Sequence, residues 1–484
     1  MKDYIKLVEE NFQEEVEFLR GLVAINSELG DEEKGPNGEV YPFGKGIQES
    51  LEYTLKGAEE MGFITYNDQN YGGHVDYGQG EKVMGILGHL DVVPAGEGWS
   101  FDPYSGAVAD GWIYGRGTTD DKGPVVASLF AMKALKEAGY EPAAKIRLIL
   151  GCDEETGWKG MDHYIEEVGP ADYGFTPDGN FPVINGEKGV LTFDLVRKLA
   201  EKKQKGLELT KLEGGAAANM VPEKARAVIH SADQSAYEKI KDMVREYSDQ
   251  HQEIKGITPI IQVRKVGTSL EIAVEGKSAH GAHPDLGLNA ISILMEMLAK
   301  INFANEEVND IIAFYNDRLG FDLGGERLGC DLEDEPSGHL TLNVGVVKYD
   351  KKSLTLTINI RYPVTMTEDQ VYEGIIEVTD KYDLGIVKRN GHDPIFFPED
   401  APLVKTFMDV YQSFTGDLES KPLVIGGGTY ARSMKNVIGF GAAFPDDLDL
   451  MHQRDERMEL SKFMTMTKIF AEAIYKITQE DFEL

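Results

Sequence analysis

The chain has 484 residues, of which 42% are hydrophobic, and its 49 basic and 83 acidic side chains give a formal net charge of −34 at pH 7. This charge argues against a sequence-independent grip on nucleic-acid phosphates and against an acidic membrane surface. The length is typical of two large or three smaller domains with sizeable cores.

The composition also indicates the compartment. Cys152 and Cys330 are the only cysteines, which excludes a disulfide framework and favours a reducing environment. The first ten residues lack the apolar core of a secretory signal, and no run approaches the roughly 18 apolar residues of a membrane span. We therefore expect a cytoplasmic protein that uses neither a membrane nor a nucleic acid.

The N-terminal part alternates predicted helices and strands. Apolar residues at three- and four-residue spacing predict helices over 3–24 and 125–138. Short apolar runs predict buried strands at 83–91, 145–151 and 171–175, and acidic residues lie at or just beyond the end of each run. This alternation predicts an α/β fold with a mixed, largely parallel sheet between helices.

The pattern changes after about residue 188. Alternating apolar and polar residues predict half-buried strands, and helical patterns lie between them. The strands are expected at 225–230, 269–275 and 353–361, and the helices near 236–248, 288–301 and 367–380. We expect an inserted α+β domain over 188–394 and a first domain built from 1–187 and 395–484.

Acids and histidines gather just beyond the predicted strand ends, where open α/β sheets bind ligands. The segments are His89-Leu-Asp91, Asp120-Asp121-Lys122-Gly123, Asp153-Glu154-Glu155, Pro177-Asp178-Gly179 and Met451-His452-Gln453. Each segment alone is a weak signal, because a lone histidine or acidic pair is usually a satisfied surface group. Together they supply the histidine and carboxylate ligands that suit zinc, manganese or cobalt. Two ions about 3.5–4 Å apart also need a shared carboxylate, which this set can provide.

In this order, the segments resemble the di-zinc peptidase clan of aminoacylases, succinyl-diaminopimelate desuccinylases, glutamate carboxypeptidases and carnosinase-like dipeptidases. The resemblance spans nearly the whole chain. The stretches Gly-Gly-Ala-Ala-Ala-Asn-Met-Val-Pro, around Asn219, and Gly-Gly-Gly-Thr-Tyr-Ala-Arg, from Gly426, are most similar to bacterial PepV-type dipeptidases.

The resemblance implies a two-metal site. His89 and Asp178 would bind one ion, Glu155 and His452 the other, and Asp120 would bridge the two. Zinc is the expected metal, with manganese or cobalt as alternatives.

The resemblance also assigns the neighbours of these ligands. Glu154 would be the general base, and the Asp120–Asp121 peptide bond would be cis. Asp91 would accept the other imidazole N–H of His89 and so fix its tautomer; the alternative is an ordinary turn aspartate.

Other residues would contact the substrate. His280 resembles the family histidine that donates to the oxyanion, and Asn219 resembles a substrate-contacting asparagine. Arg361 would bind a substrate carboxylate from the open face of its strand, although a charge there is usually only solvated. A glycine-rich loop without the lysine of a phosphate-binding motif would add backbone and hydroxyl contacts: Gly427, Gly428 and Thr429.

The function that follows is a metal-dependent dipeptidase. A water between the two ions would lose its proton to Glu154, attack the amide carbonyl, and leave an oxyanion held by His280. The substrate would be a dipeptide with a free C-terminal carboxylate, and a monomer is expected because the long insertion carries His280. The alternatives are another amidohydrolase of the clan, such as an N-acyl amino acid deacylase or carboxypeptidase, or a ligand-binding relative without catalysis.

Overall fold

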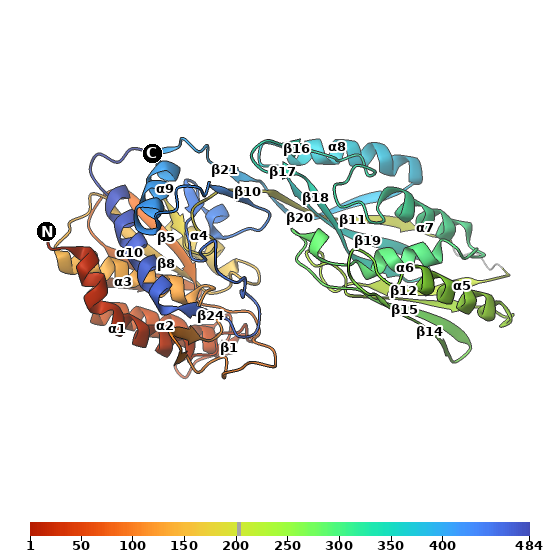
Figure 1. Cartoon of the computed structure of the whole chain (residues 1–484), viewed down its shortest axis with the longest axis horizontal. Helices are drawn as coiled ribbons and strands as arrows, with labels where there is room; N and C mark the ends of the chain where they lie inside the picture. Colours follow the sequence, from red (N-terminus) through yellow and green to blue (C-terminus); the bar gives the residue numbers. More distant parts are fainter. Residues whose placement is uncertain (201–204) are drawn as a thin grey trace. The chain divides into compact units, whose positions relative to one another are not determined.

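A computed structural model describes residues 1–200 and 205–484 (Figure 1). The chain divides into two compact units. Unit 1 comprises Met1–Asn185, Phe397–Leu423 and Gly428–Leu484, and unit 2 comprises Gly186–Phe396 and Val424–Gly427. Unit 1 is therefore built from segments on both sides of unit 2 in the sequence.

Unit 1 is organised around a mixed sheet with the strand order β10-β23-β9-β5-β8-β4-β3. The four strands from β23 to β8 are mutually parallel, whereas β10, β4 and β3 pair antiparallel. The bounds are β3 (Ile64–Asn67), β4 (Gly72–Tyr77), β5 (Val83–His89), β8 (Lys145–Gly151), β9 (Tyr173–Thr176), β10 (Ile184–Glu187) and β23 (Val437–Gly439). The predicted mixed, largely parallel sheet is confirmed.

Helices pack against this sheet and against one another. Helix α3 contacts β5, β8, α1 and α10, while α2 and α4 contact β4. The bounds are α1 (Tyr4–Val23), α2 (Lys45–Glu60), α3 (Lys122–Ala138), α4 (Lys159–Val168), α9 (Pro402–Thr415) and α10 (Leu460–Ile477). Phe175 of β9 lies 5.5 Å from the ring centroids of both Phe407 in α9 and Phe470 in α10. The C-terminal segment thus completes the core that begins in the N-terminal half.

Glycines let the central strands approach closely near the predicted ligands. Gly85 of β5 lies opposite Gly174 of β9, and a side chain on Gly174 would overlap the Gly85 carbonyl oxygen. A side chain on Gly88 would press against the Asp121 carboxylate and Val125. Positions 174 and 88 therefore require glycine if β5 is to lie close to β9 and to the start of α3.

Other strands of the chain have two or three residues each. β6 (Ala107–Ala109), β7 (Trp112–Tyr114) and β24 (Arg457–Glu459) form a three-stranded sheet in the order β24-β7-β6. β1 (Glu33–Lys34) pairs antiparallel with β2 (Val40–Tyr41). β16 (Glu333–Asp334) pairs with β17 (Gly338–His339), whereas β21 (Ile395–Phe396) and β22 (Leu423–Ile425) both pair with β10.

Unit 2 contains an antiparallel eight-stranded sheet in the order β14-β15-β13-β12-β18-β19-β11-β20. The strands are β11 (Gly189–Lys198), β12 (Glu208–Gly214), β13 (Lys224–His230), β14 (Ile260–Val266), β15 (Ser269–Glu275), β18 (Thr341–Tyr349), β19 (Ser353–Tyr362) and β20 (Gly385–His392). The helices are α5 (Ala236–Gln250), α6 (Ala290–Leu298), α7 (Glu306–Arg318) and α8 (Glu368–Thr379). The α+β character expected of the insertion is confirmed.

Two further expectations concern cysteines and membranes. Cys152 and Cys330 are buried and unpaired. Across residues 1–200 and 205–484, no helix has the length and apolar character needed to cross a membrane.

Candidate metal centre

The parallel strands bring the candidate ligands of unit 1 to one edge of the sheet. His89 is the last residue of β5, Glu154 and Glu155 follow β8, and Asp178 follows β9. Because parallel strands share the direction of their carboxyl ends, these side chains meet at the same edge. Asp120 joins them from the segment that enters α3.

The Asp120 carboxylate lies between two histidines. Its Oδ1 is 3.1 Å from His89 Nε2, and its Oδ2 is 2.9 Å from His452 Nε2. Each oxygen of one carboxylate therefore faces a different imidazole nitrogen, which is the geometry that a bridging ligand requires. The Asp120–Asp121 peptide bond is cis, as the resemblance implied.

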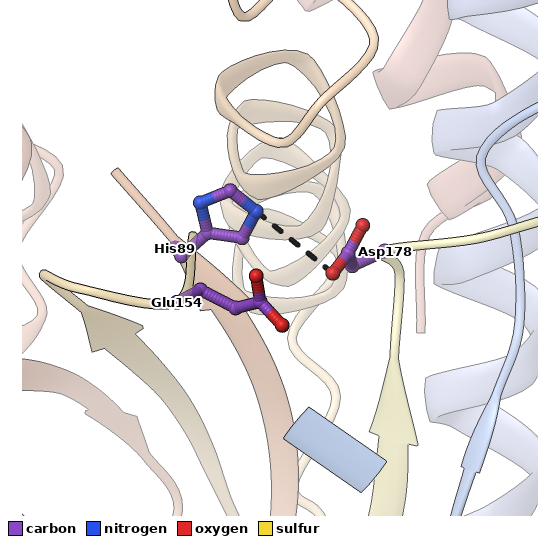
Figure 2. Close-up of side chains that lie close together, drawn as sticks. All are labelled: His89, Glu154 and Asp178. Atoms are coloured by element: carbon purple, nitrogen blue, oxygen red, sulfur yellow. Dashed lines mark ion pairs between the residues drawn. The ribbon is translucent and has the colours of Figure 1, made fainter. Parts of the chain in front are cut away.

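The other acids extend this arrangement on both sides. His452 Nε2 is also 3.0 Å from Glu155 Oε1, and His89 Nε2 is 3.8 Å from Asp178 Oδ2. Figure 2 shows the His89–Asp178 pair with the Glu154 carboxylate beside it. Within the described residues, 1–200 and 205–484, two groups have ligand atoms close enough to share a metal ion: His89, Glu154 and Asp178, and His89, Asp120 and Glu155.

Glu154 differs from its neighbours in its hydrogen bonding. Among residues 1–200 and 205–484, no group donates a hydrogen bond to its carboxylate, which leaves both oxygens able to accept a proton. Its backbone is nevertheless fixed, because its N–H donates to Asp91 Oδ1 at 3.1 Å and its carbonyl accepts from Trp158 Nε1 at 2.8 Å.

Asp91 acts on the site through two sets of contacts. The Nδ1 of His89 is 2.9 Å from the Asp91 backbone carbonyl and 3.4 Å from its carboxylate. A proton on Nδ1 would leave the Nε2 lone pair, on the side of Asp120, available to a metal ion. The resemblance implied that the Asp91 carboxylate accepts the imidazole N–H of His89. The carboxylate mainly accepts the backbone N–H groups of Glu154 and Glu155, at 3.1 and 3.0 Å.

The clustered charges shift the pKa values of the acids. Burial and the nearby Asp178 charge raise the pKa of Glu154 well above its usual range. Burial, reinforced by Asp120, raises the pKa of Asp178 to about 7. Hydrogen bonds to Asp120 and Glu155 raise the pKa of His452 to about 11.

The donor set fits a divalent cation. Imidazole nitrogens and carboxylate oxygens are the ligands that zinc and similar ions accept. A cation would relieve the repulsion among the acids, because opposite charge favours their ionised forms. His452 also has a positive φ of 61°, a left-handed conformation that is uncommon for non-glycine residues.

The remaining predicted site residues lie mostly in unit 2. The segments of Asn219 and His280 run side by side: Gly281 N–H donates to the Asn219 carbonyl at 2.6 Å, and Met220 pairs with His280. The glycine-rich loop is divided between the units, with Gly427 in unit 2 and Gly428 in unit 1. Thr429 caps the short helix that follows it, accepting the Ala431 N–H at 3.2 Å.

The expectation that Arg361 lies on an open face of its strand is wrong. Arg361 is 6% exposed, and Asn359 on the same face of β19 is 2% exposed. A polar network explains how these groups are tolerated: Arg361 Nε donates to Asn359 Oδ1 at 3.2 Å, and Asn359 Nδ2 donates to Thr192 Oγ1 at 3.0 Å. The guanidinium is thus held in place rather than free in water.

Sequence reasoning missed two buried charged residues beside the ligands, Arg116 and Glu456. Glu456 accepts hydrogen bonds from the backbone next to Asp120, although 336 positions separate the two residues. The available signal was an acid four residues after His452. Spacing alone gives no reason to prefer it to the other acids of the segment.

An α/β unit that gathers histidines and carboxylates at its strand ends is typical of metal-dependent hydrolases. The chain belongs to peptidase family M20/M25/M40, whose model matches residues 85–476. The resemblance inferred from the motifs is therefore confirmed.

Relatives match over nearly the full length. A Staphylococcus epidermidis protein named "Putative dipeptidase" is 36% identical over 476 residues, which cover 96% of this chain and 97% of the relative. "Putative dipeptidase YtjP" from Bacillus subtilis is 36% identical over 480 residues, covering 99% of both chains. The crystal structure of human carnosine dipeptidase 1 has a similar fold, with a TM-score of 0.55 and 17% identity over 98% of both chains.

We expect metal binding to release protons. At pH 7 the metal-free protein holds a proton on His452, because its pKa is raised to about 11, whereas a metal ligand must be neutral. Affinity should therefore rise with pH, by about tenfold per pH unit for each proton released. Calorimetric titration of metal-free protein with zinc, in buffers of different ionisation enthalpy, measures the number of protons.

His163→Ala is the matched control, because His163 also pairs with an aspartate, Asp68, but lies outside the cluster. His452→Ala should release fewer protons and bind less metal, whereas His163→Ala should titrate like the wild type. Zinc binding by the wild type without proton release would contradict the prediction.

Proposed function

We propose that the chain is a two-metal dipeptidase that hydrolyses dipeptides with a free C-terminal carboxylate. The observation that carries this proposal is the Asp120 carboxylate, whose two oxygens lie 3.1 and 2.9 Å from the Nε2 atoms of His89 and His452. Full-length relatives at 36% identity that carry dipeptidase names support the substrate class.

The proposed ligand sets follow the contacts within unit 1. His89 and Asp178 would hold one ion, Glu155 and His452 the other, with Asp120 shared between them. Zinc is the proposed metal, and manganese or cobalt could replace it because histidine and carboxylate sites accept all three. When bound, such ions lower the pKa of a coordinated water and polarise a carbonyl.

The chain's own groups would move protons and hold charge. Glu154 would take the proton of the attacking water and pass it to the departing amine; its raised pKa and free carboxylate suit that exchange. His280 would donate a hydrogen bond to the oxyanion. Asp91 would keep His89 in the tautomer that leaves Nε2 free.

The substrate contacts are proposed for unit 2 and the glycine-rich loop. Arg361 would bind the C-terminal carboxylate, and Asn219 the peptide backbone. The loop would add close backbone and hydroxyl contacts: Gly427, Gly428 and Thr429. Residues 188–394 would serve as the lid, and because the chain supplies its own His280, a monomer is the proposed active form.

The function is tested by reconstituting metal-free protein with zinc or manganese. The panel contains mixed dipeptides, tripeptides, and N-acetyl and N-succinyl amino acids. We expect cleavage of dipeptides that depends on added metal and stops after chelation. Cleavage confined to N-acyl amino acids would retain the metal chemistry and overturn the dipeptidase assignment.

The base is tested by Glu154→Gln, which keeps the shape of the side chain but cannot accept the proton. We expect turnover to fall by about 10²–10⁴-fold, the usual share of general acid–base catalysis, while metal content stays at the wild-type level. Turnover by mass spectrometry and metal content by elemental analysis are measured on the same sample.

Glu155→Gln is the matched comparison, because the adjacent glutamate contacts His452 and should lose metal together with activity. A Glu154→Gln protein that remained active, or one that lost its metal, would remove Glu154 as the base.

Arg361→Ala tests the carboxylate contact. A hydrogen bond to a charged group contributes about 1.5–3 kcal/mol, so kcat/KM for free dipeptides should fall roughly 10- to 100-fold. C-terminally amidated dipeptides should lose much less. The two series are compared in steady-state assays of the same preparation.

Arg389→Ala is the control, because Arg389 lies on β20 of the same sheet and pairs with Asp194 at 2.8 Å. Equal losses on free and amidated peptides, with unchanged thermal stability, would exclude Arg361 from carboxylate recognition.

A further inference from the structure

A buried ion pair lies beside the metal centre in unit 1. Arg116 Nη1 is 2.6 Å from Glu456 Oε2, and the two residues are 1% and 0% exposed. Arg116 lies just after β7 and Glu456 just before β24, which are paired strands. Burying two charges costs free energy unless their hydrogen-bonding capacity is well used, so the other contacts of this pair are informative.

The second oxygen of Glu456 holds the segment that leads into Asp120. Glu456 Oε1 accepts N–H groups from Gly117 at 3.1 Å, Thr119 at 2.8 Å and Asp120 at 3.2 Å. It also accepts the Thr119 hydroxyl at 2.9 Å. One carboxylate oxygen thus accepts from four donors, and its negative charge strengthens these hydrogen bonds. Glu456 therefore fixes the backbone from which the Asp120 side chain projects.

Arg116 connects this segment to two other loops. Its Nη1 donates to the Gln453 carbonyl at 3.3 Å, next to His452. Its Nη2 donates to the Pro94 carbonyl at 3.4 Å, five residues after His89, and its guanidinium lies 5.2 Å from the Trp99 ring centroid. The pair thus joins the three segments that carry His89, Asp120 and His452.

We propose that Arg116 and Glu456 are positioning residues of the metal centre: they set the spacing at which the two oxygens of Asp120 face His89 and His452. The proposal rests on the proposed function, because it takes these three residues as metal ligands. Groups that orient metal ligands from behind commonly change metal affinity 10- to 100-fold when they are removed. If the pair only filled buried space, its substitution would change the free energy of unfolding without changing the affinity for metal.

The test is zinc affinity of the full-length protein, measured by competition with a chromogenic chelator. Glu456→Gln keeps an oxygen for the Asp120 segment but places an amide N–H₂ against Arg116. We expect zinc binding weaker by 10- to 100-fold. The visible spectrum of the cobalt-substituted protein should also change, because it reports ligand geometry directly.

Glu15→Gln is the matched control. Glu15 is a fully buried glutamate of the same unit and accepts a hydrogen bond from Thr467 of α10. Glu15 itself is far in sequence from every ligand segment. It should alter thermal stability but leave zinc affinity within twofold of the wild type. Its spectrum with cobalt should match the wild type.

Arg116→Lys keeps the charge opposite Glu456 but cannot contact Gln453 and Pro94 together, so it tests the proposal if Glu456→Gln fails to fold. Weaker zinc binding by either variant, with Glu15→Gln unaffected, supports the proposal. Wild-type affinity and spectrum in both variants overturn it.

The proposed function has its own readout in the same series. A wild-type protein that bound no zinc, or an Asp120→Asn protein that bound it as well as the wild type, would refute the metal centre itself. If the Arg116 and Glu456 variants bound zinc like the wild type while Asp120→Asn did not, the positioning role would be refuted and the metal centre would stand.

Discussion

The electrostatics of the candidate site in unit 1 are set by the mutual repulsion of carboxylates held at one edge of a parallel sheet. Asp120, Glu154, Glu155 and Asp178 cannot all be ionised in a buried cluster without compensating positive charge. In the metal-free protein, His452 supplies part of that charge, and its pKa is raised to about 11 as a result. The same repulsion would be relieved by a divalent cation, whose charge favours the ionised form of each acid. The affinity for metal and the pKa values of the cluster therefore depend on the same repulsion between carboxylates.

Much of the scaffold could be predicted because it follows local patterns. The apolar runs that became β5, β8 and β9 have a strand-like length, and their last residues or the residues just after them are the ligand candidates. Parallel strands end at a common edge, so sequence order sufficed to bring His89 and Asp178 together. Helix α10 was not identified, although its buried face closes the core of unit 1. It was missed even though residues 395–484 were expected to return to the first domain.

The contacts that were missed depend either on groups distant in sequence or on what covers the face of a strand. Glu456 meets the Asp120 segment across 336 positions, and no spacing rule connects them. Arg361 was expected on a wet face because alternation in β19 reports which residues are polar, not what covers them. Its partner Asn359 is 2% exposed, so that polar face is an internal network. Sequence thus predicts the type of ligand at each strand end more readily than the groups that hold it.

The division of unit 1 into separate segments has a consequence for the order in which the site forms. Translation makes His89, Asp120, Glu155 and Asp178 first, then the whole of unit 2, and only afterwards His452 and Glu456. A nascent chain that ends within unit 2 already carries the acids but lacks His452, the histidine that compensates part of their charge. Until residues 428–484 emerge, the acids must remain protonated, solvated or bound to free cations. Completion of the metal centre is therefore coupled to completion of the fold.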